Sequence, residues 1–224
     1  VSETATATVS ITIGAPLTYA YSVTYDKGTG TAGTLAAQTG NGTTVTLSAF
    51  STSTMVKPGY TFSGWLGSNS TNYTDAQILT FTSALTVTLT AQWTANPSRT
   101  VTYNAGTGTG TVPTQLDVLQ GATFVVAAGT TLTKPGYTFS GWKDETATAY
   151  VAGATFTVAA TNVVLTAQWT ANPLRTITYS AGTGTGTVPT QLDVLQGATF
   201  IVAAGTGLTK PGYTFSGWKD ETGT

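Results

Sequence analysis

The sequence predicts a mainly-β protein made of tandem repeats, and two observations carry that prediction. The nonapeptide Lys-Pro-Gly-Tyr-Thr-Phe-Ser-Gly-Trp occurs three times, starting at Lys57, Lys134 and Lys210. Identical stretches at a regular spacing are the signature of a repeat array, and they override a domain count based on length. The chain is also rich in Thr, Val and Gly, which are poor helix formers, and no window has helical spacing of its apolar residues. We therefore expect small β domains arranged end to end.

The repeat divides the chain into segments. The third copy of the repeat is incomplete. It stops before the counterpart of Tyr150–Trp169 and lacks the closing strand, so we interpret the chain as a fragment of a longer protein. The joints Thr94–Pro97 and Thr170–Pro173 are short, and the residue before a proline is restricted, so we expect limited bending. The expected segments are 1–16 as a strand of a preceding domain or an N-terminal donor strand, 17–97 as repeat 1, 98–173 as repeat 2, and 174–224 as repeat 3.

Alternating apolar and polar residues predict the strands. In Leu85–Trp93, for example, Leu89, Ala91 and Trp93 share one face and threonines and Gln92 the other, which is typical of a strand with one buried face. The glycine before the tryptophan of the nonapeptide permits a β-bulge. The other expected strands are 5–13, 21–25, 44–48, 60–65, 101–103, 116–119, 122–126, 137–142, 154–158 and 163–169.

The composition excludes several classes of function. Charged residues make up 8% of the chain and the net charge is −1, whereas nucleic-acid binding needs clustered Lys and Arg. Hydrophobic residues make up 40%, which argues against disorder. There is no run of 18 apolar residues, so we expect no membrane insertion in this fragment.

Catalysis, cofactors and metals are not expected. The chain has no His and no Cys, which removes serine and cysteine nucleophile systems and nearly every zinc or haem site. Most of the nine acidic residues fall in predicted turns. The loops 106–110 and 182–186 resemble a phosphate cradle, but Thr-Val-Pro follows them instead of the helix that such a cradle needs.

The repeated aromatic residues are predicted to form the core of each unit, because buried rings carry a large share of a small core. The alternative is a platform on which a sugar stacks. The chain's first strand could also be a donor to an incomplete sheet, through Val9, Ile11 and Ile13. The predicted core residues are Tyr60, Phe62, Trp65, Trp93, Tyr103, Tyr137, Phe139, Trp142, Trp169, Tyr179, Tyr213, Phe215 and Trp218.

The repeat resembles a known family. A Val-Thr-Tyr opening, a Gly-rich loop, a Gly-Tyr-Thr-Phe-Ser-Gly-Trp centre and a Leu-Thr-Ala-Gln-Trp close are similar to the Listeria–Bacteroides repeat, the group that contains the B-repeat of internalin-type surface proteins. The resemblance covers about residues 18–224. It implies a small β-grasp-like domain of secreted or wall-attached bacterial proteins that acts as a stalk or adhesion segment without catalysis. It brings no catalytic residues.

Three functions follow as hypotheses. The first is a non-catalytic extracellular segment of a bacterial surface protein that acts as a stalk or adhesin region. The second is a self-assembling surface fibre, in which the open edge of the third repeat accepts a strand from another copy. The third is a glycan-binding repeat module. The expected partners are neighbouring repeats or other copies of the chain, and a host or matrix glycan or protein.

Overall fold

The computed structural model describes residues 14–222, and these residues form two compact units. The first unit ends at Pro97 and also includes Leu119–Ala122, and the second consists of Ser98–Val118 and the residues from Thr123 onwards. The mainly-β prediction is confirmed, because the one helical element in the described residues is the 3-10 turn η1 (Phe50–Thr52). The finer β-grasp-like description stays a prediction. No helix in this part of the chain has the length and apolar character needed to cross a membrane.

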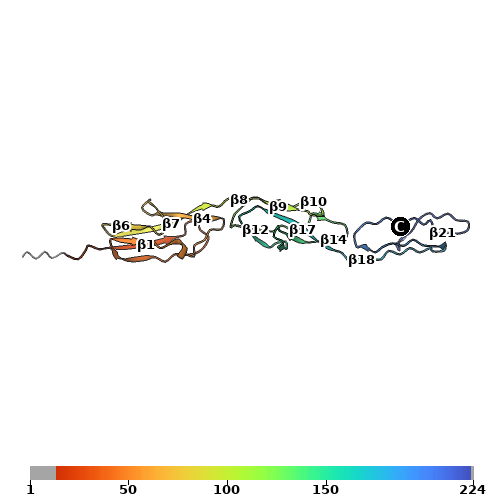
Figure 1. Ribbon diagram of the computed structural model, residues 1–224, viewed down its shortest axis with the longest axis horizontal. Coiled ribbons are helices and arrows are strands. Elements are labelled where there is room, and N and C mark those ends of the chain that lie inside the picture. Colours follow the sequence, from red (N-terminus) through yellow and green to blue (C-terminus); the bar gives the residue numbers. More distant parts are fainter. Residues whose placement is uncertain (1–13, 223–224) are drawn as a thin grey trace, which may run out of the picture. The chain divides into compact units, whose positions relative to one another are not determined.

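The first unit contains a five-stranded sheet in the order β2-β1-β7-β4-β5. Its strands β1, β4 and β7 are labelled in Figure 1. Strand β1 runs parallel to β7, and the other neighbours are antiparallel. A separate pair, β3 and β6, completes the unit. The strands are β1 (Tyr19–Asp26), β2 (Gln38–Gly42), β3 (Thr44–Thr46), β4 (Tyr60–Gly67), β5 (Asn72–Tyr73), β6 (Ile78–Thr80) and β7 (Leu85–Ala95).

The second repeat rebuilds this arrangement around a four-stranded sheet in the order β15-β14-β17-β9, with β9 parallel to β17. The pairs β12–β16 and β10–β13 accompany it, and β8 pairs with β11. The strands are β8 (Ser98–Arg99), β9 (Val101–Asn104), β10 (Thr109–Gly110), β11 (Val118–Leu119), β12 (Thr123–Val125), β13 (Leu132–Thr133), β14 (Tyr137–Lys143), β15 (Ala149–Tyr150), β16 (Thr155–Thr157) and β17 (Val163–Ala171).

The closing strands have the expected alternation. In β17 the side chains of Leu165 and Ala167 are buried, and those between them are half-buried. In β7 the residues Val87, Leu89 and Ala91 are buried in the same way. This pattern places the core on one face of each sheet, against the short strand pairs.

The β-bulge before each tryptophan of the first two repeats is also confirmed. The register of β4 on β7 shifts between Phe62 and Gly64, and that of β14 on β17 between Phe139 and Gly141. The two glycines have φ values of 128° and 135°, a backbone conformation that residues other than glycine rarely adopt. The bulge turns Trp65 and Trp142 into the core, where they are 1% and 0% exposed.

The nonapeptide of the third repeat, although identical in sequence to the one that forms β14, does not form a strand. The described residues of this repeat contain four short paired strands, and Tyr213 forms only an isolated bridge with Lys210. Two predicted core residues are exposed, Tyr213 at 71% and Phe215 at 42%. The reason is that no strand equivalent to β17 lies beside them in the described residues, and a β-strand needs a partner for its backbone. The strands are β18 (Leu174–Arg175), β19 (Thr185–Gly186), β20 (Val194–Leu195) and β21 (Leu208–Thr209).

Candidate functional site

The centre of each repeat is an aromatic cluster, which in the second repeat is held by two polar anchors. In the second repeat the rings of Tyr103 and Phe139 lie 4.6 and 5.1 Å from that of Trp142. The Tyr103 hydroxyl accepts a hydrogen bond from the Ala127 amide, and the Trp142 indole donates to the Ala127 carbonyl, at 2.9 and 2.8 Å. A buried Tyr or Trp usually finds a partner for its polar atom. These rings therefore serve the core.

The first repeat lacks one of these anchors. The Tyr25 hydroxyl accepts a hydrogen bond from Ser48 as Tyr103 does from Ala127, but the buried Nε1 of Trp65 has no hydrogen-bond partner. Instead, Phe50 from η1 packs near the Trp65 ring, with their centroids 6.2 Å apart. The inserted turn thus replaces a polar contact with an apolar one.

The structure places the other predicted residues as follows. Val9, Ile11 and Ile13 lie outside the described residues. Tyr213 and Phe215 are exposed, as given above. Trp65, Tyr103 and Trp142 are buried, and Tyr60, Phe62, Trp93, Tyr137, Phe139, Trp169, Tyr179 and Trp218 are partly buried.

A lysine lies over one face of the repeated tyrosine of the nonapeptide. The Nζ atom of Lys134 lies 3.8 Å from the centre of the Tyr137 ring and donates a hydrogen bond to Thr107 in the Gly-rich loop. The same lysine contact recurs at Tyr60 and Tyr213. A cation over an aromatic ring is attracted by its negative face. The lysine therefore occupies one face of the tyrosine ring, and it ties the Gly-rich loop to the nonapeptide.

Tyr150, which lies outside the repeated aromatic pattern, belongs to a polar turn. The carboxylate of Asp144 accepts hydrogen bonds from the backbone amides of Thr146 and Thr148, both at 2.9 Å, and from the Tyr150 hydroxyl at 3.2 Å. Burial by itself raises the pKa of Asp144, but these hydrogen bonds outweigh it, so the pKa lies below its usual value. Desolvation and the neighbouring carboxylate raise the pKa of Tyr150. The pair therefore stabilises the turn in which it lies.

Each joint between repeats is a set of defined contacts. In the second unit the backbone N–H of Asn172 donates to the Gly136 carbonyl at 2.9 Å. The side-chain Nδ2 of Asn172 donates to the backbone carbonyl of Gln196 at 2.8 Å. Thr138 donates to the Asn172 side-chain oxygen at 2.7 Å, and the Gln196 amide donates to the Pro173 carbonyl at 2.9 Å. The asparagine of the Asn-Pro joint thus bonds to the repeat before it and to the repeat after it.

An apolar contact completes the joint. A Cβ atom placed on Gly136, which has a φ of 80°, would lie 2.9 Å from the Cβ of Leu195 and 3.0 Å from that of Ala198. The turn Leu195–Ala198 therefore lies directly against the Pro-Gly turn of the second repeat. The first unit has the same contacts between Gly59 and Leu119–Ala122, and the Asn96 side chain donates to the Gln120 carbonyl at 2.8 Å. We call this set of contacts, at either joint, the clamp.

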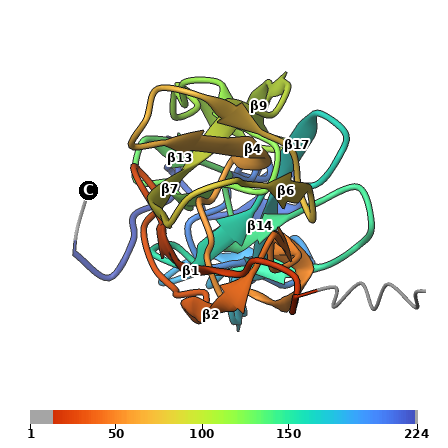
Figure 2. The same cartoon turned by 90° about the vertical axis from the view of Figure 1, so that its left-hand side faces the viewer.

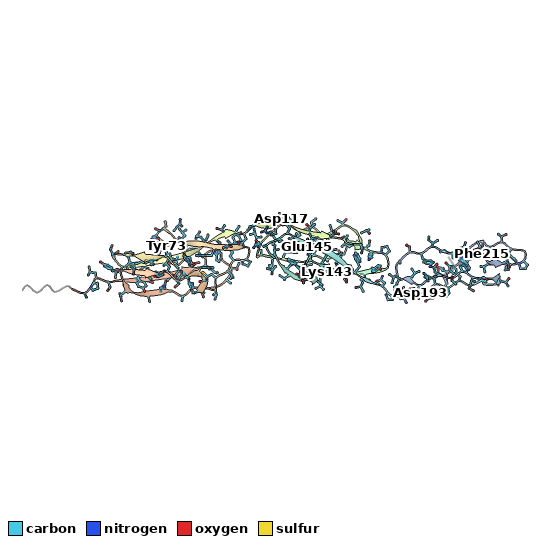
Figure 3. All side chains as sticks on the ribbon, in the orientation of Figure 1. Tyr73, Asp117, Lys143, Glu145, Asp193 and Phe215 are labelled. Atoms are coloured by element: carbon cyan, nitrogen blue, oxygen red, sulfur yellow. The ribbon has the colours of Figure 1, made fainter. Side chains whose placement is uncertain are left out.

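The loops that lead into the clamp expose an unusual pair of side chains. Leu116 and Leu192 are each 85% exposed, and Asp117 and Asp193 follow them (Figure 3). The other four aspartates of the described chain each accept a backbone hydrogen bond within a turn or loop. In residues 14–222 neither Asp117 nor Asp193 accepts a hydrogen bond from the protein, so this Leu-Asp pair has no evident role in holding its own loop.

The described part of the chain contains no group of three or more His, Cys, Asp or Glu side chains that could hold a metal ion. A hollow of about 1180 Å³ is an open groove of the third repeat lined by residues such as Tyr179, Phe215 and Trp218. In the second repeat β17 lies between the corresponding segments. The groove is therefore an uncovered part of a core.

Comparison with known protein families agrees with this geometry. The model of the Listeria-Bacteroides repeat domain matches residues 21–92 and 176–224, and that of the divergent InlB B-repeat domain matches residues 99–173. The chain belongs to the Listeria-Bacteroides repeat family. Repeats of this family are typical of bacterial surface proteins and are generally non-catalytic. No solved structure matches the chain.

Sequence reasoning missed the clamp and the lysine contact. Asn-Pro marked the joint, but the partner of the asparagine lies 24 residues further on, in a stretch that was expected to be a plain break between strands. The lysine of the nonapeptide was not predicted to contact the tyrosine ring or the Gly-rich loop. One signal could have pointed to both contacts. The same Lys, Thr and Asn residues recur at polar positions of the repeats, where strand propensity alone does not require them.

Proposed function

We propose that the chain is a non-catalytic spacer of an extracellular bacterial surface protein, and that its repeats build length between a binding segment and the cell. The observation that carries the proposal is the clamp. The same hydrogen bonds and the same leucine contact occur at both joints. A joint that is bonded on both sides adds the length of a repeat without a freely rotating link, which is the property that a spacer needs.

The absence of an assembled site also supports this proposal. The large rings of the first two repeats serve the core, and a lysine lies over one face of each nonapeptide tyrosine. Low charge and an alternating Thr-rich outer face fit a surface that makes few contacts of its own.

Surface display tests the spacer role. The chain would be inserted between a cell-wall anchor and a fluorescent reporter, and the height of the reporter above the membrane would be measured by super-resolution microscopy. Deleting residues 98–173 joins Pro97 to Leu174, so that the turn Leu195–Ala198 can dock on Gly59 and the clamp is kept. The reporter should sit lower by one repeat. An unchanged height would contradict the spacer role.

A second function, adhesion, is favoured by the Leu-Asp loops. Leu116 with Asp117, and Leu192 with Asp193, present an apolar group and a carboxylate that the fold itself does not use. Loops on a rigid frame commonly carry binding residues. The first repeat has no such pair, because Leu35 packs against the core of that unit and no acidic residue follows it. Adhesion through these loops would thus belong to the second and third repeats.

Coated particles can test adhesion. Particles carrying the chain would be applied to cultured epithelial cells beside particles carrying a variant with Leu116→Ser, Asp117→Asn, Leu192→Ser and Asp193→Asn. Val125→Ser with Ile201→Ser is the matched control, since both residues are exposed and apolar but lie elsewhere. Adhesion should fall with the loop variant only. Equal adhesion of all three particle types, or of none above background, would remove this function.

A further inference from the structure

The first repeat differs from the other two at the position that forms the clamp. Its glycine Gly42 corresponds to Gly121 and Gly197, which can be counted from the strand pairs β3–β6 and β12–β16. Two residues before this glycine stand Gly40 in the first repeat, Leu119 in the second and Leu195 in the third. The first repeat therefore lacks the leucine that contacts the preceding Pro-Gly turn.

The backbone differs as well as the side chain. In the second and third repeats this stretch is a turn, closed by hydrogen bonds from Ala122 to Leu119 and from Ala198 to Leu195, both at 2.9 Å. Gly121 and Gly197 have φ values of 83° and 82°. Gly42 is not among the residues with positive φ. It belongs to β2, which pairs with β1 over five residues, so the first repeat uses the stretch inside its own sheet.

A tyrosine fixes this alternative. A Cβ atom on Gly40 would lie 2.8 to 3.0 Å from the hydroxyl and ring of Tyr21, so the ring occupies the space that a leucine side chain would need. The Tyr21 ring also contacts that of Phe81, at 5.9 Å. Arg99 and Arg175 stand in place of Tyr21 in the later repeats, as the pairing of Val23 with Val87 and of Val101 with Val163 shows. Arg175 bonds to the Gln196 side chain at 2.8 Å and so supports the clamp turn.

The other half of the clamp is intact in the first repeat. Gly59 and Asn96 make the same contacts with the second repeat as Gly136 and Asn172 make with the third. The first repeat can therefore accept a following repeat, while its opposite side presents the polar stretch Thr39-Gly40-Asn41-Gly42-Thr43. Terminal units of repeat arrays commonly have such an atypical polar face.

We propose that the first repeat is a capping repeat, which clamps a repeat on its C-terminal side and cannot be clamped to one on its N-terminal side. Any segment that precedes it is attached without this clamp. The partner that its C-terminal end fits is a repeat that carries a Leu-Gln-Gly-Ala turn after an Asn-Pro joint. The capping role does not depend on the spacer role, because it concerns which repeat can follow which.

The test is an exchange of repeats within the full chain. Residues 98–173 would be replaced by a second copy of residues 20–97, so that a first-type repeat follows Asn96-Pro97 and the native joint to the third repeat is regenerated behind it. The chain has no cysteine, so spin labels can be placed at the exposed Thr86, at its counterpart in the inserted copy, and at Thr178. Pulsed electron paramagnetic resonance then gives the distance distribution across each joint.

We expect a broad distribution across the new joint and a narrow one across the regenerated joint, which serves as the internal control. Rescue should follow when the inserted copy carries Val-Leu-Gln-Gly-Ala in place of Thr39-Gly40-Asn41-Gly42-Thr43, together with Tyr21→Arg. Equal narrow distributions at both joints of the unrescued chain would overturn the proposal. So would a rescue variant whose new joint stays broad while its circular dichroism matches that of the unrescued chain.

Discussion

At the scale of single residues, small differences between repeats decide whether the buried polar atoms of each core find hydrogen-bond partners. Trp142 and Trp218 donate to the carbonyls of Ala127 and Ala203 at 2.8 and 2.7 Å, whereas the buried Nε1 of Trp65 has no hydrogen-bond partner. An unsatisfied buried polar group costs about 1–3 kcal/mol. The three copies of one nonapeptide are therefore unequal in energy, although their sequences are identical.

This inequality predicts different costs for the same substitution. Trp142→Phe removes an indole and leaves the Ala127 carbonyl without its donor, while Trp65→Phe removes a donor that was unpaired. Relative to Trp65→Phe, we expect Trp142→Phe to lower the free energy of unfolding of its own repeat by about 1–2 kcal/mol more. Native-state hydrogen exchange of the amides in β1 and β9 would report each repeat separately. Equal losses in both repeats would contradict the account.

The Asp144 turn predicts a local sensitivity to acid. Because the folded pKa of Asp144 is lowered, its contribution to stability is present above its unfolded pKa of about 3.9 and is lost as the pH falls through the folded value. A carboxyl NMR titration should place its midpoint below about 3.9, with amide exchange in the turn rising over the same range. In Asp144→Asn that rise should disappear. A midpoint at or above the unfolded value would contradict the assignment.

At the scale of elements, the bulge glycine shows which local features the sequence predicts and which depend on a neighbour. The bulge itself follows from Gly-Trp after an alternating strand. The amount of free space around the bulge glycine does not follow from the local sequence. A Cβ atom on Gly141 would lie 2.6 Å from the Tyr150 carbonyl oxygen, while one on Gly217 would meet nothing within 4 Å.

These two glycines form a matched pair for mutation. Gly141→Ala suffers from both the positive φ of 135° and the clash with Tyr150, and it should destabilise the second repeat by more than about 3 kcal/mol. Gly217→Ala should cost less, since only the backbone conformation opposes it. Chemical unfolding followed by hydrogen exchange would compare the two. Similar effects of the two substitutions would argue against the clash as the cause.

The third repeat shows that a strand can be specified by sequence and still need a partner. Its nonapeptide is identical to that of β14, yet Phe215 is 42% exposed and no ladder forms around it. Appending the sequence of residues 149–171 to Thr224, which is the counterpart of Thr148, should convert 213–218 into a strand. Amide exchange of these residues should slow by at least about tenfold, because a closing strand pairs their backbone groups. Unchanged exchange would show that the segment does not form a strand even with its partner.

At the scale of the whole chain, sequence alone predicted the repeat, the β class, the alternating faces and the bulges, because each depends on residues close together in the chain. It did not predict the clamp, in which Asn172 meets Gln196. Nor did it predict the self-pairing in the first repeat of β1 with β2, which lie beside each other in Figure 2. These depend on whether Leu195 or Gly40 occupies a single position, and on a tyrosine 19 residues from that glycine. The alternation of apolar and polar residues along a strand does not predict contacts between residues that are this far apart in the sequence.

Clamped repeats should each add length to the chain, and small-angle X-ray scattering can measure that length. The chain would be compared with the variant lacking residues 98–173 and with Asn96→Ala/Asn172→Ala, which removes the side chains that bond across both joints. The account predicts a maximum dimension that falls by one repeat in the deletion variant, and a more flexible scattering profile in the asparagine variant. A compact particle whose maximum dimension hardly changes on deletion, and whose profile ignores the asparagines, would contradict it.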